Sequence, residues 1–144
     1  MKTPKIEFRY SYYYDEQCKK SSLAHNKLKN NKYPSSKEIL SYIKVIKKRW
    51  MPIERKILAE LSKISNLQWK EDKITCYIVG YSIPFSDPLT MPIYKNYPNY
   101  FIDTLIHELI HQLFCQEGNL EKAKKAWKYI FKKYKKNSYT TKIH

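Results

Sequence analysis

Residues 101–116 read FIDTLIHELIHQLFCQ, and this stretch decides the fold prediction. Its apolar residues recur at intervals of three and four, the spacing that places side chains along one side of an α-helix. They are Ile102, Leu105, Ile106, Leu109, Ile110 and Leu113. Gly118 follows as a natural helix stop. The stretch therefore predicts an amphipathic helix that buries its apolar side in a core.

The other side of this helix carries His107-Glu108-Leu109-Ile110-His111, an H-E-x-x-H motif. Two histidines four residues apart lie on the same side of a helix, so both can bind one Zn²⁺ ion. The glutamate beside the first histidine can then act as a general base on the zinc-bound water. Two alternatives remain open: a zinc site without catalysis, and two surface histidines with a solvated glutamate on an ordinary amphipathic helix.

The rest of the chain predicts a single α+β domain covering residues 1–144. The predicted elements are a strand over 5–14, a polar linker with room for a short helix over 15–34, helices over about 36–49 and 53–66, a buried strand over 74–81, a helix over 120–136 and an extended tail over 137–144. Ser35 or Ser36, followed by Glu38, resembles a helix N-cap. Three prolines within residues 83–93 exclude a central strand and favour an extended edge segment.

With this order of elements around its H-E-x-x-H motif, the sequence resembles the zincin metallopeptidases. It looks most like the very small gluzincin-like proteins called minigluzincins, over residues 70–118 and elsewhere by element order alone. The resemblance implies a zincin-like α+β domain with a small twisted sheet. It also implies an edge strand, here Ser86–Met91, that lies next to the active-site helix and binds a peptide substrate by β-augmentation. An ordinary edge strand protected by Pro88 and Pro92 is the alternative.

A catalytic zinc needs a third protein ligand, which the motif does not supply. The resemblance implies a glutamate on a later helix, but Glu117 and Glu121 are the only carboxylates that follow the motif. In a continued helix, Glu117 lies about 9 Å past His111 along the axis. The extended tail 137–144 spans up to about 26 Å and can bring His144 back to the metal. His144 is therefore the preferred third ligand, and Glu121, Glu117 and an external ligand stay open.

Further residues have candidate roles near this site. Asp103 either accepts a hydrogen bond from the ring of His107 or, as we prefer, favours the N-terminus of the helix. A tyrosine can donate a hydrogen bond to the oxyanion of the tetrahedral intermediate, although packing is the expected role of each. The candidates are Tyr129, Tyr134 and Tyr139. Cys115 is expected to be a buried thiol rather than a ligand.

The composition limits the location and the partners of the protein. Of its 144 residues, 28 are Lys or Arg and 13 are Asp or Glu, so the net charge is 28 − 13 = +15. A hydrophobic content of 42% excludes a disordered polybasic tail. Three irregularly spaced cysteines argue against a disulfide scaffold, and no apolar run reaches the roughly 18 residues of a membrane span. We therefore expect a cytoplasmic monomer. The charge permits a nucleic-acid partner, although an excess of solvated lysines is the preferred explanation.

Together these observations predict a zinc metalloendopeptidase that acts on peptides or proteins. His107, His111 and His144 would bind Zn²⁺, and Glu108 would activate the zinc-bound water and pass its proton to the leaving amine. One alternative is an SprT-like protease that acts on proteins associated with nucleic acid. The other is a non-catalytic, basic nucleic-acid-binding module with a structural zinc.

Overall fold

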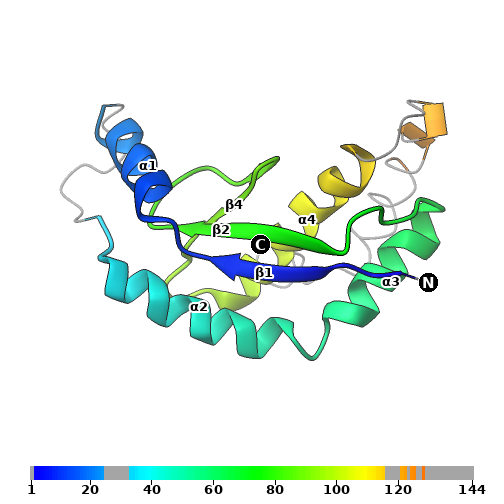
Figure 1. The fold of residues 1–144 in the computed structure, drawn as a ribbon, viewed down its shortest axis with the longest axis horizontal. Coiled ribbons are helices and arrows are strands. Elements are labelled where there is room, and N and C mark those ends of the chain that lie inside the picture. The colour runs from blue at the N-terminus through cyan, green and yellow to red at the C-terminus, as the bar shows by residue number, and fades with distance from the viewer. Residues whose placement is uncertain (1, 25–32, 116–120, 123, 126–127, 129–144) are drawn as a thin grey trace.

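The computed structural model describes residues 2–24, 33–115, 121–122, 124–125 and 128. These residues form a mixed α and β fold, which confirms the predicted α+β class (Figure 1). The elements are β1 (Lys5–Arg9), α1 (Tyr12–Ala24), α2 (Ser36–Trp50), α3 (Glu54–Ser65), β2 (Lys73–Val79), β3 (Phe85–Ser86), β4 (Leu89–Pro92) and α4 (Pro98–Cys115). The predicted last helix lies mostly outside the described residues, and the predicted tail lies entirely outside them.

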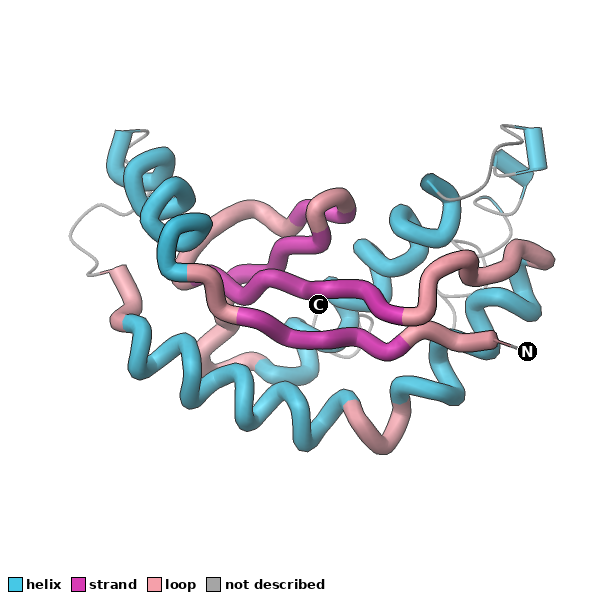
Figure 2. The backbone as a smooth tube through the Cα atoms, in the orientation of Figure 1, coloured by secondary structure: helices cyan, strands magenta, loops and turns pink. Residues whose placement is uncertain are grey.

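The four strands form one sheet in the order β1-β2-β4-β3 (Figure 2). Strands β1, β2 and β4 are parallel, and the short edge strand β3 is antiparallel to β4. Phe8 packs against Phe101 of α4, with ring centroids 6.2 Å apart. Tyr77 points to the other face and packs against Tyr14 of α1, with centroids 5.3 Å apart. Helices α4 and α1 therefore cover opposite faces of the sheet.

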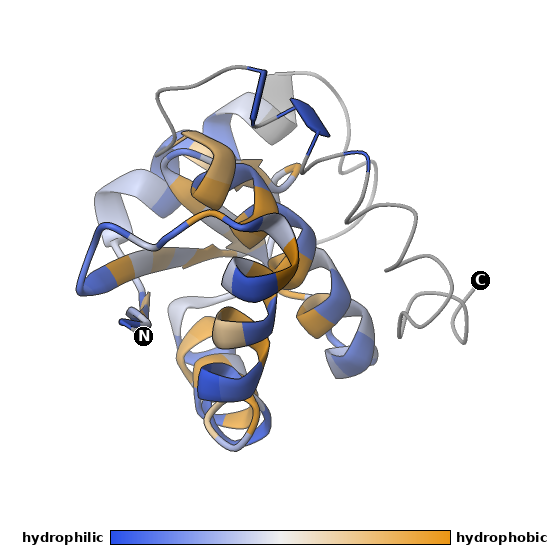
Figure 3. Cartoon of the chain, turned by 90° about the vertical axis from the view of Figure 1, so that its right-hand side faces the viewer, coloured by the Kyte–Doolittle hydropathy of each residue, from blue (hydrophilic) through white to orange (hydrophobic). Residues whose placement is uncertain are grey.

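The core lies between the sheet and the helices α2, α3 and α4. Figure 3 shows that the helices carry both hydrophobic and hydrophilic residues, as amphipathic elements do. All six apolar residues predicted to line one side of α4 are buried. Trp50 and Phe101 are the largest of the fully buried side chains. Because α4 is fixed by its apolar side, the histidines of its other side are held in a defined position.

Two helix boundaries follow directly from local residue chemistry. The Ser35 hydroxyl accepts the N–H of Glu38 at 3.2 Å, which confirms the predicted N-cap of α2. Asn66 ends α3 in the left-handed conformation, with φ 56°. Asparagine tolerates this conformation better than most residues, and it often terminates helices in this way.

The prediction of one strand over 5–14 is wrong beyond Arg9. The carbonyl of Ser11 accepts the N–H of Asp15 at 2.9 Å, and its hydroxyl faces the N–H of Tyr14 at 3.5 Å. Ser11 thereby caps a helix that begins at Tyr12. The polar residues 15–24, predicted as a linker, belong to this helix α1. Alternating tyrosines are a misleading strand signal here because a capping serine stands among them.

The prolines of residues 83–93 do not exclude a central strand, contrary to the prediction. Strand β4, which contains Pro92, lies between β2 and β3 and is a central strand. Pro92 is tolerated because it is the last residue of β4, and the next N–H, that of Ile93, donates to Val79 at 3.0 Å. The predicted edge segment Ser86–Met91 is therefore part of a hairpin, and of its residues only Ser86 belongs to the edge strand β3 (Phe85–Ser86).

A buried carboxylate fixes α1 to the end of β2. Asp15 is 4% exposed and accepts hydrogen bonds from the N–H of Gly80 at 2.9 Å, the hydroxyl of Tyr10 at 3.3 Å and the hydroxyl of Tyr33. A Cβ at Gly80 would lie 2.6 Å from the ring of Tyr33. Glycine lets the backbone just after β2 approach this ring so closely.

Candidate metal centre

The two histidines of the motif face each other on α4. Nε2 of His107 and Nε2 of His111 are 3.2 Å apart, and the ring centroids are 4.9 Å apart. Two nitrogens bound at 2.0–2.1 Å to one tetrahedral ion lie about 3.3 Å from each other. The separation of the two nitrogens therefore matches that of two ligands of one Zn²⁺ ion. The same separation also fits an N–H···N hydrogen bond between the rings.

Burial favours the neutral form of both histidines, the form that metal binding requires. Burial lowers the pKa of His107, and burial together with the neighbouring His107 lowers the pKa of His111. Neutral imidazole carries the lone pair that ligates a metal, whereas the protonated ring does not. The lowered pKa values of the two histidines therefore favour the form that can ligate a metal.

Glu108 lies between the two histidines in the sequence and is 8% exposed. Burial raises the pKa of its carboxyl group. A carboxylate with a raised pKa is a stronger proton acceptor, the property that a general base needs. Burial is also the main reason why the pKa of Tyr94 rises to about 12, and the charge of Glu108 adds to this rise. Tyr94 is thus a protonated hydroxyl near Glu108 that no sequence pattern identified.

No residue of the described part of the chain completes a three-ligand site with the two histidines. In that part of the chain, no third His, Cys, Asp or Glu joins His107 and His111 in a group able to hold a metal. Glu121 is described and exposed, and it does not complete the pair. Glu117 and the preferred candidate His144 lie outside the described residues, as do Tyr129, Tyr134 and Tyr139. Their proposed roles remain predictions.

A side-chain contact joins the motif helix to the edge strand. Gln112, which directly follows His111, donates a hydrogen bond from Nε2 to the carbonyl of Ser86 in β3. Nearby in the sequence, Ile83 and Phe85 expose 57% and 45% of their surface. Gln112 was missed because its partner is 26 residues away, and no local pattern reports such a contact. The contact sets β3 beside the candidate metal centre.

Two further expectations near the site are wrong. Asp103 lies beyond the first turn of α4 and is 5% exposed, so it does not serve the helix N-terminus as preferred. Its Oδ2 has no hydrogen-bond partner among the described residues. Cys115 is exposed rather than buried, because α4 ends there and its side chain is not covered by the described residues.

Asp103 leads to a prediction about stability. Burial raises the pKa of this carboxyl group from 3.8 to about 6. The protonated form therefore stabilises the folded state fully below the unfolded value of 3.8, and this contribution is lost as the pH rises through about 6. Asparagine does not ionise, so Asp103→Asn removes this loss at high pH. At about 1.4 kcal/mol per pKa unit, the difference in the free energy of unfolding between the variant and the wild type should be about 2 to 3 kcal/mol more favourable to the variant at pH 8 than at pH 4.

Urea denaturation of Asp103→Asn at both pH values measures this difference. Asp72→Asn is the matched control, because Asp72 is exposed and pairs with Lys2 at 2.7 Å on the surface. An equal change in the free energy of unfolding at pH 4 and pH 8 for Asp103→Asn would show that burial does not destabilise the ionised carboxylate.

Comparison with known proteins gives no relative: no protein-family model, curated protein or solved structure matches this chain. Within the described part of the chain, no helix is long and apolar enough to cross a membrane. The function must therefore be inferred from the residues of α4 and from the strands that they contact.

Proposed function

We propose that this protein is a zinc-dependent metallopeptidase with a zincin-like fold. The observation that carries the proposal is the 3.2 Å separation of the two Nε2 atoms on α4, with the buried Glu108 between the two residues. Two neutral imidazoles and an adjacent carboxylate of raised pKa are the groups that metal-assisted hydrolysis of an amide needs.

Each residue has a separate role in this reaction. His107 and His111 hold the ion, and His144 is the proposed third protein ligand. Zn²⁺, when bound, acts as a Lewis acid that polarises the scissile carbonyl and lowers the pKa of water. Glu108 accepts a proton from the attacking water and then delivers it to the nitrogen of the leaving amine. Burial of Glu108 supports this role because it raises the pKa of the carboxyl group and so makes the carboxylate more basic.

The sheet supports the choice of a peptide as substrate. Strand β3 is antiparallel at the edge of an otherwise parallel sheet, and Gln112 connects it to the motif helix. An extended peptide can add to such an edge as a further strand. Because β3 has two residues and Pro88 lacks an N–H, main-chain bonds alone are few. We therefore assign part of the binding to apolar contacts with Ile83 and Phe85.

Zinc binding by single-site variants tests the site directly. The metal-free wild-type protein should bind one equivalent of Zn²⁺, and His107→Ala or His111→Ala should weaken this binding by more than about 100-fold. Loss of one ligand leaves too few donors to complete tetrahedral coordination. Competition against a chromophoric zinc chelator gives the Kd of each variant.

Two histidine variants complete this experiment. His25→Ala is the control for loss of a histidine outside the motif, and it should leave the Kd unchanged. His144→Ala should weaken binding if His144 is the third ligand. Unchanged zinc affinity in both His107→Ala and His111→Ala would overturn the proposed function. The two rings would then be joined by a hydrogen bond and not by a metal ion.

A further inference from the structure

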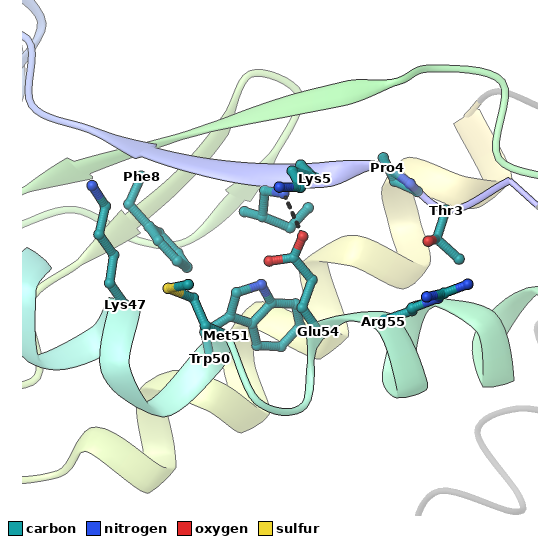
Figure 4. Close-up of a pocket in the computed structure, with 10 residues that line it drawn as sticks. Thr3, Pro4, Lys5, Phe8, Lys47, Trp50, Met51, Glu54 and Arg55 are labelled. Atoms are coloured by element: carbon teal, nitrogen blue, oxygen red, sulfur yellow. Dashed lines mark hydrogen bonds between the residues drawn. The ribbon is translucent and has the colours of Figure 1, made fainter.

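A groove follows the outer edge of β1, at the opposite edge of the sheet from β3 (Figure 4). It has a volume of about 430 Å³ and lies between β1 and the turn that joins α2 to α3. The candidate metal centre belongs to α4 and adjoins the β3 edge, so this β1-edge groove is a separate feature. Its size is within the range of pockets that hold small ligands or short peptide segments.

The backbone of β1 presents main-chain groups to this groove. The N–H of Lys5 points to the β2 side and donates to Asp72 at 2.9 Å. Since successive residues of a strand alternate in direction, the N–H of Ile6 points outward, where Glu54 Oε1 accepts it at 3.2 Å. The same alternation turns the N–H of Phe8 outward. No described strand pairs with this edge, and such an edge is a template for an added strand.

The floor of the β1-edge groove is apolar and its rim is basic. Phe8 and Trp50 are buried in the floor, whereas Met51 is 71% exposed beside them. Figure 4 shows Lys47 and Arg55 at opposite ends, with Glu54 between them. An apolar side chain of a bound partner would cover Met51. Removing this apolar surface from water would favour binding.

The charge of the lining residues favours an anionic occupant. Lys5, Lys47 and Arg55 line the β1-edge groove, and Glu54 is the one carboxylate among its lining residues. Within the described part of the chain, no ion pair joins these three cations to a carboxylate. The neighbouring Glu7 is already paired with Lys73 at 2.6 Å. Lys5 already interacts electrostatically with Glu54, so Lys47 and Arg55 are the cations proposed to pair with carboxylates of a partner.

We propose that the β1-edge groove binds an extended acidic peptide segment of a partner protein. The segment adds to β1 as a strand and replaces Glu54 as the acceptor of the N–H of Ile6. It places an apolar side chain on Met51 and directs carboxylates to Lys47 and Arg55. A peptide fits better than a nucleic acid, because a phosphodiester backbone cannot pair with the strand edge. A nucleic acid also carries a phosphate at every nucleotide, whereas a peptide can place uncharged residues beside Glu54 at the centre of the groove.

Fluorescence anisotropy with a labelled probe tests the charge contacts. The probe is the acetylated peptide Asp-Asp-Leu-Val-Leu-Asp-Asp, added to the zinc-loaded full chain carrying Glu108→Gln so that it is not cleaved. Lys47→Glu with Arg55→Glu should weaken probe binding at least tenfold. Lys37→Glu with Lys44→Glu changes the net charge equally at two exposed positions of α2 outside the groove, and it should have little effect. Equal weakening by both pairs would overturn the proposal.

A second probe, methylated on alternate backbone nitrogens, tests the strand pairing. It should bind at least tenfold more weakly than the parent peptide, and the parent should shift the amide NMR signals of Ile6 and Phe8. Equal binding of the two probes, or unshifted signals, would contradict addition to β1. An oligothymidylate of equal charge is the third probe. If its binding depends on Lys47 and Arg55 more strongly than that of the peptide, the groove is a nucleic-acid site and the peptide assignment is wrong.

Discussion

Glu108→Gln is expected to lower kcat for peptide hydrolysis by about 10³-fold while the zinc content stays at the wild-type level. Glutamine has nearly the same shape as glutamate but cannot accept a proton from water. The two histidines are unchanged, so metal binding should persist. Hydrolysis of a quenched fluorescent casein-derived peptide by the zinc-loaded protein gives kcat, and the metal content of the same sample shows whether the ion is retained.

Glu60→Gln is the matched control for this experiment, because Glu60 is an exposed residue of α3 outside the motif. It should leave kcat unchanged. Full activity of Glu108→Gln would exclude Glu108 as the general base. If the wild-type protein binds zinc but hydrolyses no peptide, the non-catalytic zinc module becomes the better description of the same two histidines.

The helix that carries the motif is predictable from the sequence, whereas its contacts with the sheet are not. A long apolar repeat is enough to assign Leu105 and Leu109 to the core, and both are buried. The hydrogen bond between Gln112 and Ser86 depends on how two distant segments fold together. Short elements are also hard to predict, since Ser11 begins a helix within an apparently continuous strand pattern and Pro92 ends a central strand. Local sequence patterns therefore locate the candidate metal ligands, but they do not show which strand lies beside the helix that carries them.

Asp15→Ala is the stability prediction with the largest expected effect. It should lower the free energy of unfolding by about 3 to 5 kcal/mol, because it leaves the N–H of Gly80 and the hydroxyl of Tyr33 without their acceptor in a buried position. A hydrogen bond to a charged group contributes more than a neutral one, and a buried unsatisfied donor loses its hydration as well. Urea denaturation followed by far-ultraviolet circular dichroism measures the change.

Two companion variants separate the hydrogen bonds of Asp15 from the helix propensity of its position. Gln17→Ala, at an exposed site of the same helix α1, should change stability by less than about 0.5 kcal/mol. Asp15→Asn keeps one acceptor for the N–H of Gly80 and should give an intermediate loss. If Asp15→Ala costs no more than Gln17→Ala, the buried carboxylate does not fix α1 to β2. A large loss would mean instead that one acidic side chain, inside a strongly basic chain, holds α1 on the face of the sheet opposite the motif helix.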